Sequence, residues 1–309
     1  MLYHLRLPGY LLFLLLMSSK SNAQKAKIDF QHCKQCVVLV EQSKDRIAIL
    51  NLDSKEMIWD WQPKDFIPTE QLAWFHLPSE VKPVMGGRYI LTTASGGAVS
   101  IIRIADKKII FYAYAGGNTH SAELLPDGNI VSASSDGNYL TVFRVDTLHF
   151  PQKIYSKKIW LAFGHNVVWD KRRKLLWAAS QNQLKSFRYN FDKDKPDLTV
   201  IDSLSLPGTQ AHDLFPVKGQ QALWLTNSIG LYQYDLKSKQ LIQINTPYHD
   251  IKSVSSGPHN ASTLLIFPED VKKGWWTNEI NSLDQGVVFK SEGLRIYKAR
   301  WFIKNTFSY

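Results

Sequence analysis

The segment His120-Ser121-Ala122-Glu123-Leu124-Leu125 is followed by a Pro-Asp-Gly-Asn turn and by the apolar run Ile130-Val131-Ser132-Ala133-Ser134. The same plan of a histidine, a short strand, a turn and an apolar strand recurs from His165 to Ser180 and from His212 to Asn227. From the histidine to the last strand residue, the three units span 14, 15 and 15 positions. A supersecondary unit used several times predicts a repeat architecture in which the three imidazoles occupy one equivalent position.

The repeat extends over most of the chain. Apolar and β-branched runs bounded by Gly, Asp and Asn turns are typical of strands, and no helical periodicity lasts beyond about two turns. A period of roughly 40–50 residues with several strands per unit is typical of a β-propeller. We therefore predict an all-β, six-bladed β-propeller, with seven blades as the alternative because the last unit is irregular. The most apolar strand of each unit begins at Val37, Ile90, Ile130, Leu175, Leu223 and Leu264.

The two ends of the repeat predict how the ring closes. The first unit begins at Val37 without an innermost strand, and the last unit runs on to a strand at Leu294–Phe302. We expect the N-terminal and C-terminal strands to pair in one shared blade, because such pairing seals the ring and removes exposed sheet edges. In the second unit we expect a short innermost strand at Lys82–Met85.

Residues 1–23 have the pattern of a secretory signal peptide. Arg6 precedes the apolar run Leu11–Met17, and Ser21-Asn22-Ala23 supplies small residues at a cleavage site. The apolar run is shorter than the roughly 20 residues that a membrane-spanning helix needs. We expect residues 24–309 to form a single propeller domain without a transmembrane segment, exported to the periplasm or the extracellular space.

The charge of the chain favours an acidic partner. The formal net charge is +10, and removal of Arg6 and Lys20 with the signal leaves 35 basic and 27 acidic residues, or +8. Such a surface suits nucleic acid, an anionic membrane or an acidic glycan. Export argues against nucleic acid, and a merely solvated basic surface is the plain alternative.

The two cysteines, Cys33 and Cys36, are separated by two residues. In an oxidising compartment they could pair, and only His32 lies close enough in sequence to add to a zinc site. We expect a structural or incidental pair rather than a redox or zinc motif.

Several short sequence segments resemble those of a known family. The chain resembles exported six- or seven-bladed propellers of glycan-degrading bacteria, which are catalogued as a domain of unknown function and belong with the WD40-like and quinoprotein-like propellers. It departs from WD40 repeats because His120 lies only six residues before Pro126. The resemblance implies the fold and export, and no settled activity. The segments are Ile58-Trp59-Asp60-Trp61, the run from Asn118 to Pro126, Val168-Trp169-Asp170, Leu176-Trp177-Ala178, His212-Asp213-Leu214 and Tyr297-Lys298-Ala299-Arg300-Trp301.

The candidate site is the mouth of the central channel. His120, His165 and His212 begin innermost strands, and the repeat register adds Lys82 and Lys252 to the same ring. Lysines and imidazoles converging in a funnel would hold a carboxylate or sulfate. One imidazole with a pKa near neutrality could then transfer a proton, as in a lyase or hydrolase acting on uronate or sulfated oligosaccharides. We expect His165 or His212 to be the essential one.

Two other interpretations stay open. Three imidazoles could share a divalent metal, as in a metal-dependent polysaccharide lyase, although the two lysines disfavour a cation. The polar ring could also only cap the channel, which would make the protein a non-catalytic glycan-binding or protein-interaction scaffold. Whether the protein is an enzyme is therefore not decided by its sequence.

Other residues are weaker candidates. Trp275 and Trp276 follow Lys272-Lys273 in a Gly-containing loop, and exposed tryptophan can stack on sugar rings. We expect this pair to form a rim platform for substrate. Glu41 and Glu123 are candidate acid partners of the histidines. Four other tryptophans are expected in the core between blades, namely Trp59, Trp61, Trp177 and Trp224.

Overall fold

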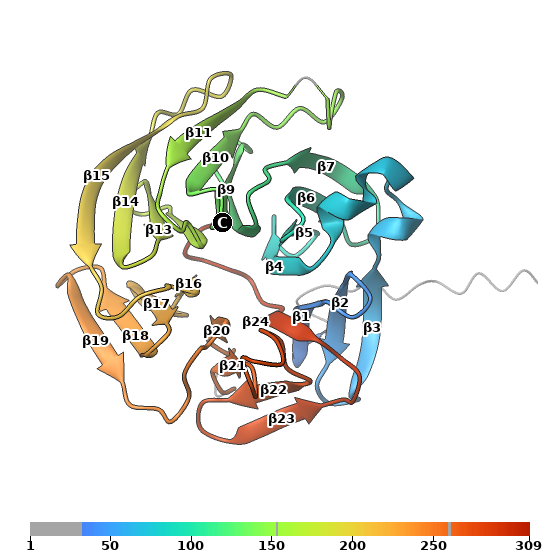
Figure 1. The fold of residues 1–309 in the computed structure, drawn as a ribbon, viewed down its shortest axis with the longest axis vertical. Coiled ribbons are helices and arrows are strands. Elements are labelled where there is room, and N and C mark those ends of the chain that lie inside the picture. The colour runs from blue at the N-terminus through green and yellow to red at the C-terminus, as the bar shows by residue number, and fades with distance from the viewer. Residues whose placement is uncertain (1–32, 153, 259–260) are drawn as a thin grey trace, which may run out of the picture.

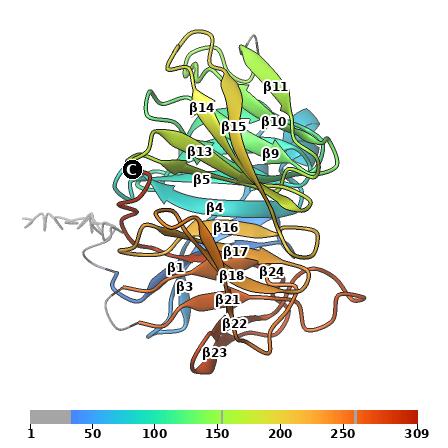
Figure 2. The same cartoon turned by 90° about the vertical axis from the view of Figure 1, so that its left-hand side faces the viewer.

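The computed structural model describes residues 33–152, 154–258 and 261–309. These residues form six four-stranded antiparallel sheets around a common axis (Figure 1). Figure 2 shows the same ring from its side. The prediction of an all-β, six-bladed β-propeller is confirmed. The predicted signal peptide, residues 1–23, lies outside the described residues.

Each blade is a meander in which neighbouring strands pair in antiparallel register. From the axis outward, blade 1 contains β24 (Ile296–Trp301), β1 (Cys36–Glu41), β2 (Arg46–Asn51) and β3 (Glu56–Trp61). Blade 2 contains β4 (Pro78–Val84), β5 (Tyr89–Ala94), β6 (Ala98–Arg103) and β7 (Ile109–Tyr114), and blade 3 contains β8 (Thr119–Leu124), β9 (Ile130–Ser134), β10 (Tyr139–Phe143) and β11 (Ser156–Trp160).

Blades 4 to 6 follow the same order. Blade 4 contains β12 (Asn166–Asp170), β13 (Leu175–Ala179), β14 (Gln183–Tyr189) and β15 (Leu198–Ser205). Blade 5 contains β16 (Asp213–Pro216), β17 (Ala222–Asn227), β18 (Gly230–Asp235) and β19 (Gln240–Ile244), and blade 6 contains β20 (Ser253–Ser255), β21 (Leu264–Ile266), β22 (Glu279–Ser282) and β23 (Gly286–Lys290). Two 3₁₀ helices, η1 (Pro63–Asp65) and η2 (Thr69–Phe75), connect β3 to β4.

The ring closes in blade 1 as predicted. The C-terminal strand β24 is innermost and pairs antiparallel with β1, with Val37 opposite Trp301 and Leu39 opposite Ala299. The two ends of the chain therefore complete one sheet, which leaves no open edge between the first and last blades.

Apolar side chains fill the spaces between blades. Trp59 and Trp61 pack between blades 1 and 2, Trp177 between blades 4 and 5, and Trp224 between blades 5 and 6. All four are at most 8% exposed, which confirms their prediction as core. Their large apolar area makes a major contribution to holding the blades together.

Strand β4 begins earlier than predicted. It starts at Pro78 rather than at Lys82. Because β4 pairs only with β5, its other edge faces the channel, where Pro78 and Pro83 remove no ladder hydrogen bond. The prolines and the polar residues Ser79 and Glu80 make this segment look unlike a buried strand in the sequence. It is nevertheless buried, because its polar side chains face other polar groups across the axis.

Two smaller expectations concern the N-terminal part and the membrane. Cys33 and Cys36 form a disulfide at the start of β1. Within the described ranges no helix is long and apolar enough to cross a bilayer.

Candidate functional site

Several innermost strands begin with a β-bulge that directs two successive side chains into the channel. In β8, Thr119 pairs with Ser134 and Ser121 pairs with Ala133, so His120 is an extra residue. The same irregularity leaves Ser79 extra in β4 and Tyr297 extra in β24. An extra residue locally bends the strand and redirects side chains. By strand register, three layers result along the axis. The upper layer consists of Ser79, His120, His165, His212, Lys252 and Tyr297, and the middle layer of Glu80, Ser121, Asn166, Asp213, Ser253 and Lys298. The lower layer includes Lys82, Glu123, Phe215, Ser255 and Arg300, whose guanidinium extends to the carboxylates of the middle layer.

The three histidines meet in the upper layer. The rings of His120 and His165 stack with centroids 4.2 Å apart and planes inclined by 12°. The ring of His212 packs edge-on against His165 at 5.3 Å. The prediction that these imidazoles come from adjacent blades and approach one another near the axis is confirmed. They are buried, however, at 3% to 7% exposure.

Lys252 and Trp275 complete this side of the upper layer. The Lys252 amine lies 2.9 Å from His212 Nε2 and 3.8 Å from the centroid of the Trp275 ring. Trp275 is 45% exposed, whereas Lys252 is 1% exposed beneath it. The indole therefore covers the amine at the upper mouth. On the other side of the layer, the Tyr297 hydroxyl lies 3.2 Å from His120 Nδ1.

Burial controls the protonation of these groups. It lowers the pKa of His120 to about 3, and it lowers the pKa of His165 and of His212 well below the usual range. Nearby charges, Lys298 and Lys252 among them, act in the same direction. Burial also lowers the pKa of Lys252 to about 7. The imidazoles are therefore neutral at physiological pH, which disfavours the predicted role of one as a general acid.

Hydrogen bonding leaves two imidazole nitrogens unused. His165 Nδ1 and His212 Nδ1 are buried and have no hydrogen-bond partner among the described residues. Since a neutral imidazole has one donor and one acceptor, each ring offers a polar atom inside the upper layer. Such buried atoms are costly unless something bonds to them.

An ionic network fills the middle layer. The Arg300 guanidinium donates to both carboxylate oxygens of Asp213 at 2.6 Å and to those of Glu80 at 3.1 Å. The Lys298 amine lies 3.3 Å from each of these carboxylates and 3.2 Å from Asn166 Oδ1. Burial alone would raise the pKa of Asp213, but Arg300 and Lys298 lower it to about 2. Two buried carboxylates and two buried cations thus compensate one another.

The lower layer is closed by the C-terminal segment. Lys82 donates to Glu123 at 3.0 Å and to the carbonyl of Val167 at 2.8 Å. After β24 the chain crosses the centre of the ring (Figure 1), and the Tyr309 hydroxyl donates to Glu123. Lys171 holds the end of this segment by donating to the Tyr309 carbonyl at 3.2 Å. The channel is therefore filled by side chains below the histidines.

Some predicted site residues lie elsewhere. Lys82 is not in the histidine ring, because the early start of β4 places it level with Glu123, three positions further along the strand. Lys252 is in register with His212, as predicted. Trp276 does not form a platform with Trp275, since its ring packs against the Arg295 guanidinium at 4.9 Å.

The two candidate acid partners do not contact the histidines either. Glu41 pairs with Arg46 at 3.0 Å and accepts from the backbone amides of Ser43 and Arg295. Glu123 pairs with Lys82 in the lower layer.

The residues of the middle layer were not among the candidates predicted from the sequence. Asn166 and Asp213 each follow a histidine of the repeat, and Lys298 and Arg300 lie in the final strand. The sequence feature that could have identified Asn166 and Asp213 is their position directly after a histidine of the repeat.

The histidine cluster is not arranged as a metal site. No group of three His, Cys, Asp or Glu in the described parts of the chain has a geometry that could hold a metal ion. The stacking of His120 on His165 explains this, because parallel rings do not converge their nitrogens on one point.

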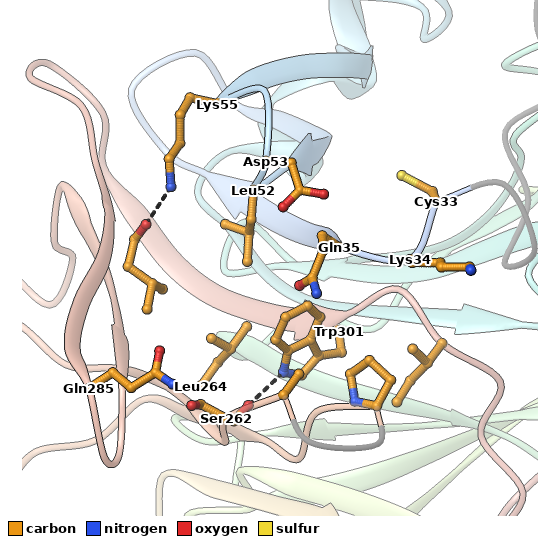
Figure 3. Close-up of a pocket in the computed structure, with 14 residues that line it drawn as sticks. Cys33, Lys34, Gln35, Leu52, Asp53, Lys55, Ser262, Leu264, Gln285 and Trp301 are labelled. Carbon is orange, nitrogen blue, oxygen red and sulfur yellow. Dashed lines mark hydrogen bonds between the residues drawn. The ribbon is translucent and has the colours of Figure 1, made fainter.

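A large cavity lies away from the axis, between blades 1 and 6. It has a volume of about 900 Å³ and is lined by residues just before β1 and just after β2, and by residues of β21, β23 and β24 with their neighbouring loops (Figure 3). Lys55 and Trp301 donate hydrogen bonds to backbone carbonyls of Val288 and Ser262 in its wall. None of the predicted site residues lines it.

Comparison with known proteins places the chain in a family. A family model described as a family of unknown function (DUF6528) matches residues 7–309. The chain belongs to this family. No curated protein matches the chain.

Solved structures share the fold of this family member. One similar structure is a protein of unknown function from Bacteroides caccae, with 17% identity and a TM-score of 0.58, covering 86% of this chain and 98% of that chain. Another is the β-propeller domain of Cps50 (Swd1) from Myceliophteria thermophila, with 13% identity and a TM-score of 0.54, covering 84% of this chain and 86% of that chain. At these identities the similarity shows the fold alone.

Proposed function

We propose that this DUF6528 protein is an exported binding protein that recognises an acidic oligosaccharide at the upper mouth of the propeller. One observation carries the proposal. Lys82 and Lys298 form ion pairs with carboxylates in the channel, whereas Lys252 is equally buried, contacts an imidazole and an indole, and forms no ion pair among the described residues. Asp250 is a carboxylate whose charge acts on the Lys252 amine, and it raises the pKa of Lys252 without overcoming the effect of burial. A buried amine without a directly paired carboxylate is destabilised, and an incoming carboxylate would supply that direct partner.

The surroundings of Lys252 suit a sugar acid. The indole of Trp275 is partly exposed and covers the amine, so a carboxylate reaches Lys252 when this side chain moves aside. The displaced ring is then free to stack on the apolar face of a sugar. The unpartnered His212 Nδ1 adds a hydrogen-bonding atom to the same region. The N-terminal signal pattern and the resemblance to propellers of glycan-degrading bacteria support export and a glycan ligand.

Binding is favoured over catalysis. A general acid or base needs a pKa near the working pH, and burial lowers the pKa of each channel histidine far from it. A lyase or hydrolase that relies on a catalytic histidine therefore ranks below a binding function. The metal-dependent lyase ranks lowest, because the stacked imidazoles do not form a metal site.

A calorimetric titration tests the proposal. The mature protein is titrated at pH 6 with a trimer of galacturonate and with the methyl ester of the same trimer, and a sulfated trimer is run in parallel. We expect the charged ligands to bind and the ester to bind at least tenfold more weakly. Lys252→Met should weaken binding of the galacturonate trimer at least tenfold, because a charge-assisted hydrogen bond contributes about 1.5–3 kcal/mol.

The matched control is Lys272→Met, which removes an exposed lysine from the loop that carries Trp275. It should leave the affinity unchanged. Equal affinities of Lys252→Met and the unaltered protein would overturn the proposal.

The filled channel favours one other candidate, a protein-interaction scaffold. In a scaffold, the ionic middle layer and the C-terminal segment that closes the channel would only make the propeller rigid. Absence of binding to every acidic oligosaccharide, at millimolar concentration, would favour the scaffold.

A further inference from the structure

A second cavity lies at the lower mouth, at the opposite end of the channel from Lys252. It has a volume of about 190 Å³. One wall is the segment from Trp301 to Phe307, and the facing wall is the turn from Pro216 to Gln221 after β16. Lys82 of β4 and Ser255 and Ser256 of blade 6 complete the lining.

The residues that line this cavity carry charges of one sign, although Lys82 is paired with Glu123 behind the wall. Lys82, Lys218 and Lys304 line it, and none of its lining residues is acidic. Lys82 is buried, and its hydrogen bonds to Glu123 and to the Val167 carbonyl leave one of its three N–H groups for another acceptor. Lys218 and Lys304 are exposed at the rim of the cavity, and their side chains form no ion pair or hydrogen bond within the described parts of the chain. With two unpaired amines, a third that keeps a free N–H group, and no carboxylate in its wall, the cavity attracts an anion.

Flat apolar surfaces accompany these amines. Phe215, Trp301 and Phe307 all line the cavity. The Arg300 guanidinium covers the Phe215 ring at 4.1 Å. A hydroxyl is available as well, because Ser256 Oγ accepts from Trp224 Nε1 at 2.7 Å and keeps its own proton for donation. An inorganic ion would leave the aromatic surfaces without a partner.

We propose that the lower-mouth cavity binds a small organic anion consisting of one planar ring and a carboxylate. The volume fits this size, since a cavity of about 150 Å³ is enough to hold benzene. The ring packs between Phe215 and Phe307, and the carboxylate is held by the lysines. The C-terminal segment forms the wall of the site, which gives its anchoring by Tyr309 and Lys171 a role in ligand binding.

The proposal is independent of the function assigned to the upper mouth. The two sites lie at opposite ends of a channel that the ionic middle layer fills. Lys252→Met should therefore leave the lower-mouth ligand unaffected, and changes at the lower mouth should leave the galacturonate trimer unaffected.

The test uses benzoate as the probe, with benzamide as its uncharged counterpart and glucuronate as a non-planar acid. Binding to the mature protein is measured by calorimetry and by the chemical-shift changes of aromatic side chains. Benzoate should bind at least tenfold more tightly than benzamide or glucuronate. The double variant Lys218→Gln/Lys304→Gln should weaken benzoate binding about tenfold or more, since hydrogen bonds to charged groups contribute about 1.5–3 kcal/mol.

Exposed lysines away from the cavity provide the control. The double variant Lys64→Gln/Lys237→Gln removes the same charge from the surface and should retain the affinity for benzoate. Three outcomes would overturn the proposal. The first is no benzoate binding at 10 mM, which is about the highest useful concentration for a weak ligand. The others are equal effects of the two double variants on benzoate affinity, and loss of benzoate binding in Lys252→Met.

Discussion

The buried ionic network makes a strong prediction about stability. Glu80, Asp213, Lys298 and Arg300 are all fully buried, and their formal charges cancel. Arg300→Met removes one cation and leaves two carboxylates facing Lys298 alone. Breaking a buried ion pair by removing one partner costs about 3–5 kcal/mol. We expect a loss of that size in the free energy of unfolding.

Urea unfolding measures this loss, with the slope against urea expected to stay constant. The control is Arg103→Met, which breaks an Arg–Asp pair whose side chains are 37% and 49% exposed. It should leave the free energy of unfolding nearly unchanged, because exposed pairs are screened by solvent. The double variant Arg300→Met/Glu80→Gln restores charge neutrality and should recover part of the loss. The reasoning is refuted if Arg300→Met costs no more than Arg103→Met, or if the second substitution adds its own full cost.

Three further outcomes follow from the channel. The folded-state pKa of Asp213, about 2, lies below the unfolded value near 3.9. This group therefore contributes roughly 2 kcal/mol to the free energy of unfolding above pH 4, and the contribution is lost as the pH falls toward 2. Acid unfolding should show this loss, and Arg300→Met should show little of it. The ring-carbon proton of His120 should not shift between pH 5 and 8 in nuclear magnetic resonance spectra, because burial lowers its pKa to about 3, and a midpoint in that range would contradict the burial argument. Tyr309→Phe removes the hydroxyl that donates to buried Glu123 and should cost about 1–3 kcal/mol by urea unfolding, whereas no loss would show that the C-terminal segment is not anchored there.

The repeat pattern was enough to predict the ring and the meeting of the histidines. His120, His165 and His212 stand at equivalent distances from the apolar second strand, and equivalent positions of a propeller face the same axis. The closure by β24 and β1 followed from the missing innermost strand before Val37. These features depend on period and alternation, which are local properties of the sequence.

The register of Lys82 and the ionic network could not be predicted in the same way. A bulge shifts the register of β4 by one residue, and the prolines make its first half unrecognisable as a strand from the sequence. The pairing of Arg300 with Glu80 joins residues 220 positions apart and depends on which side chains share a layer of the closed ring. Burial, which lowers the pKa of each channel histidine, likewise follows from the packing around the axis.

Proton uptake on binding tests the central claim most directly. If a carboxylate pairs with Lys252, whose pKa is about 7 in the free protein, the amine becomes fully protonated in the complex. Calorimetry of the galacturonate trimer in two buffers of different ionisation enthalpy should give uptake of about 0.9 proton at pH 8 and close to none at pH 5.5. Above pH 7 the affinity should fall toward tenfold per pH unit. Binding without proton uptake at pH 8, or the same uptake in Lys252→Met, would contradict the account.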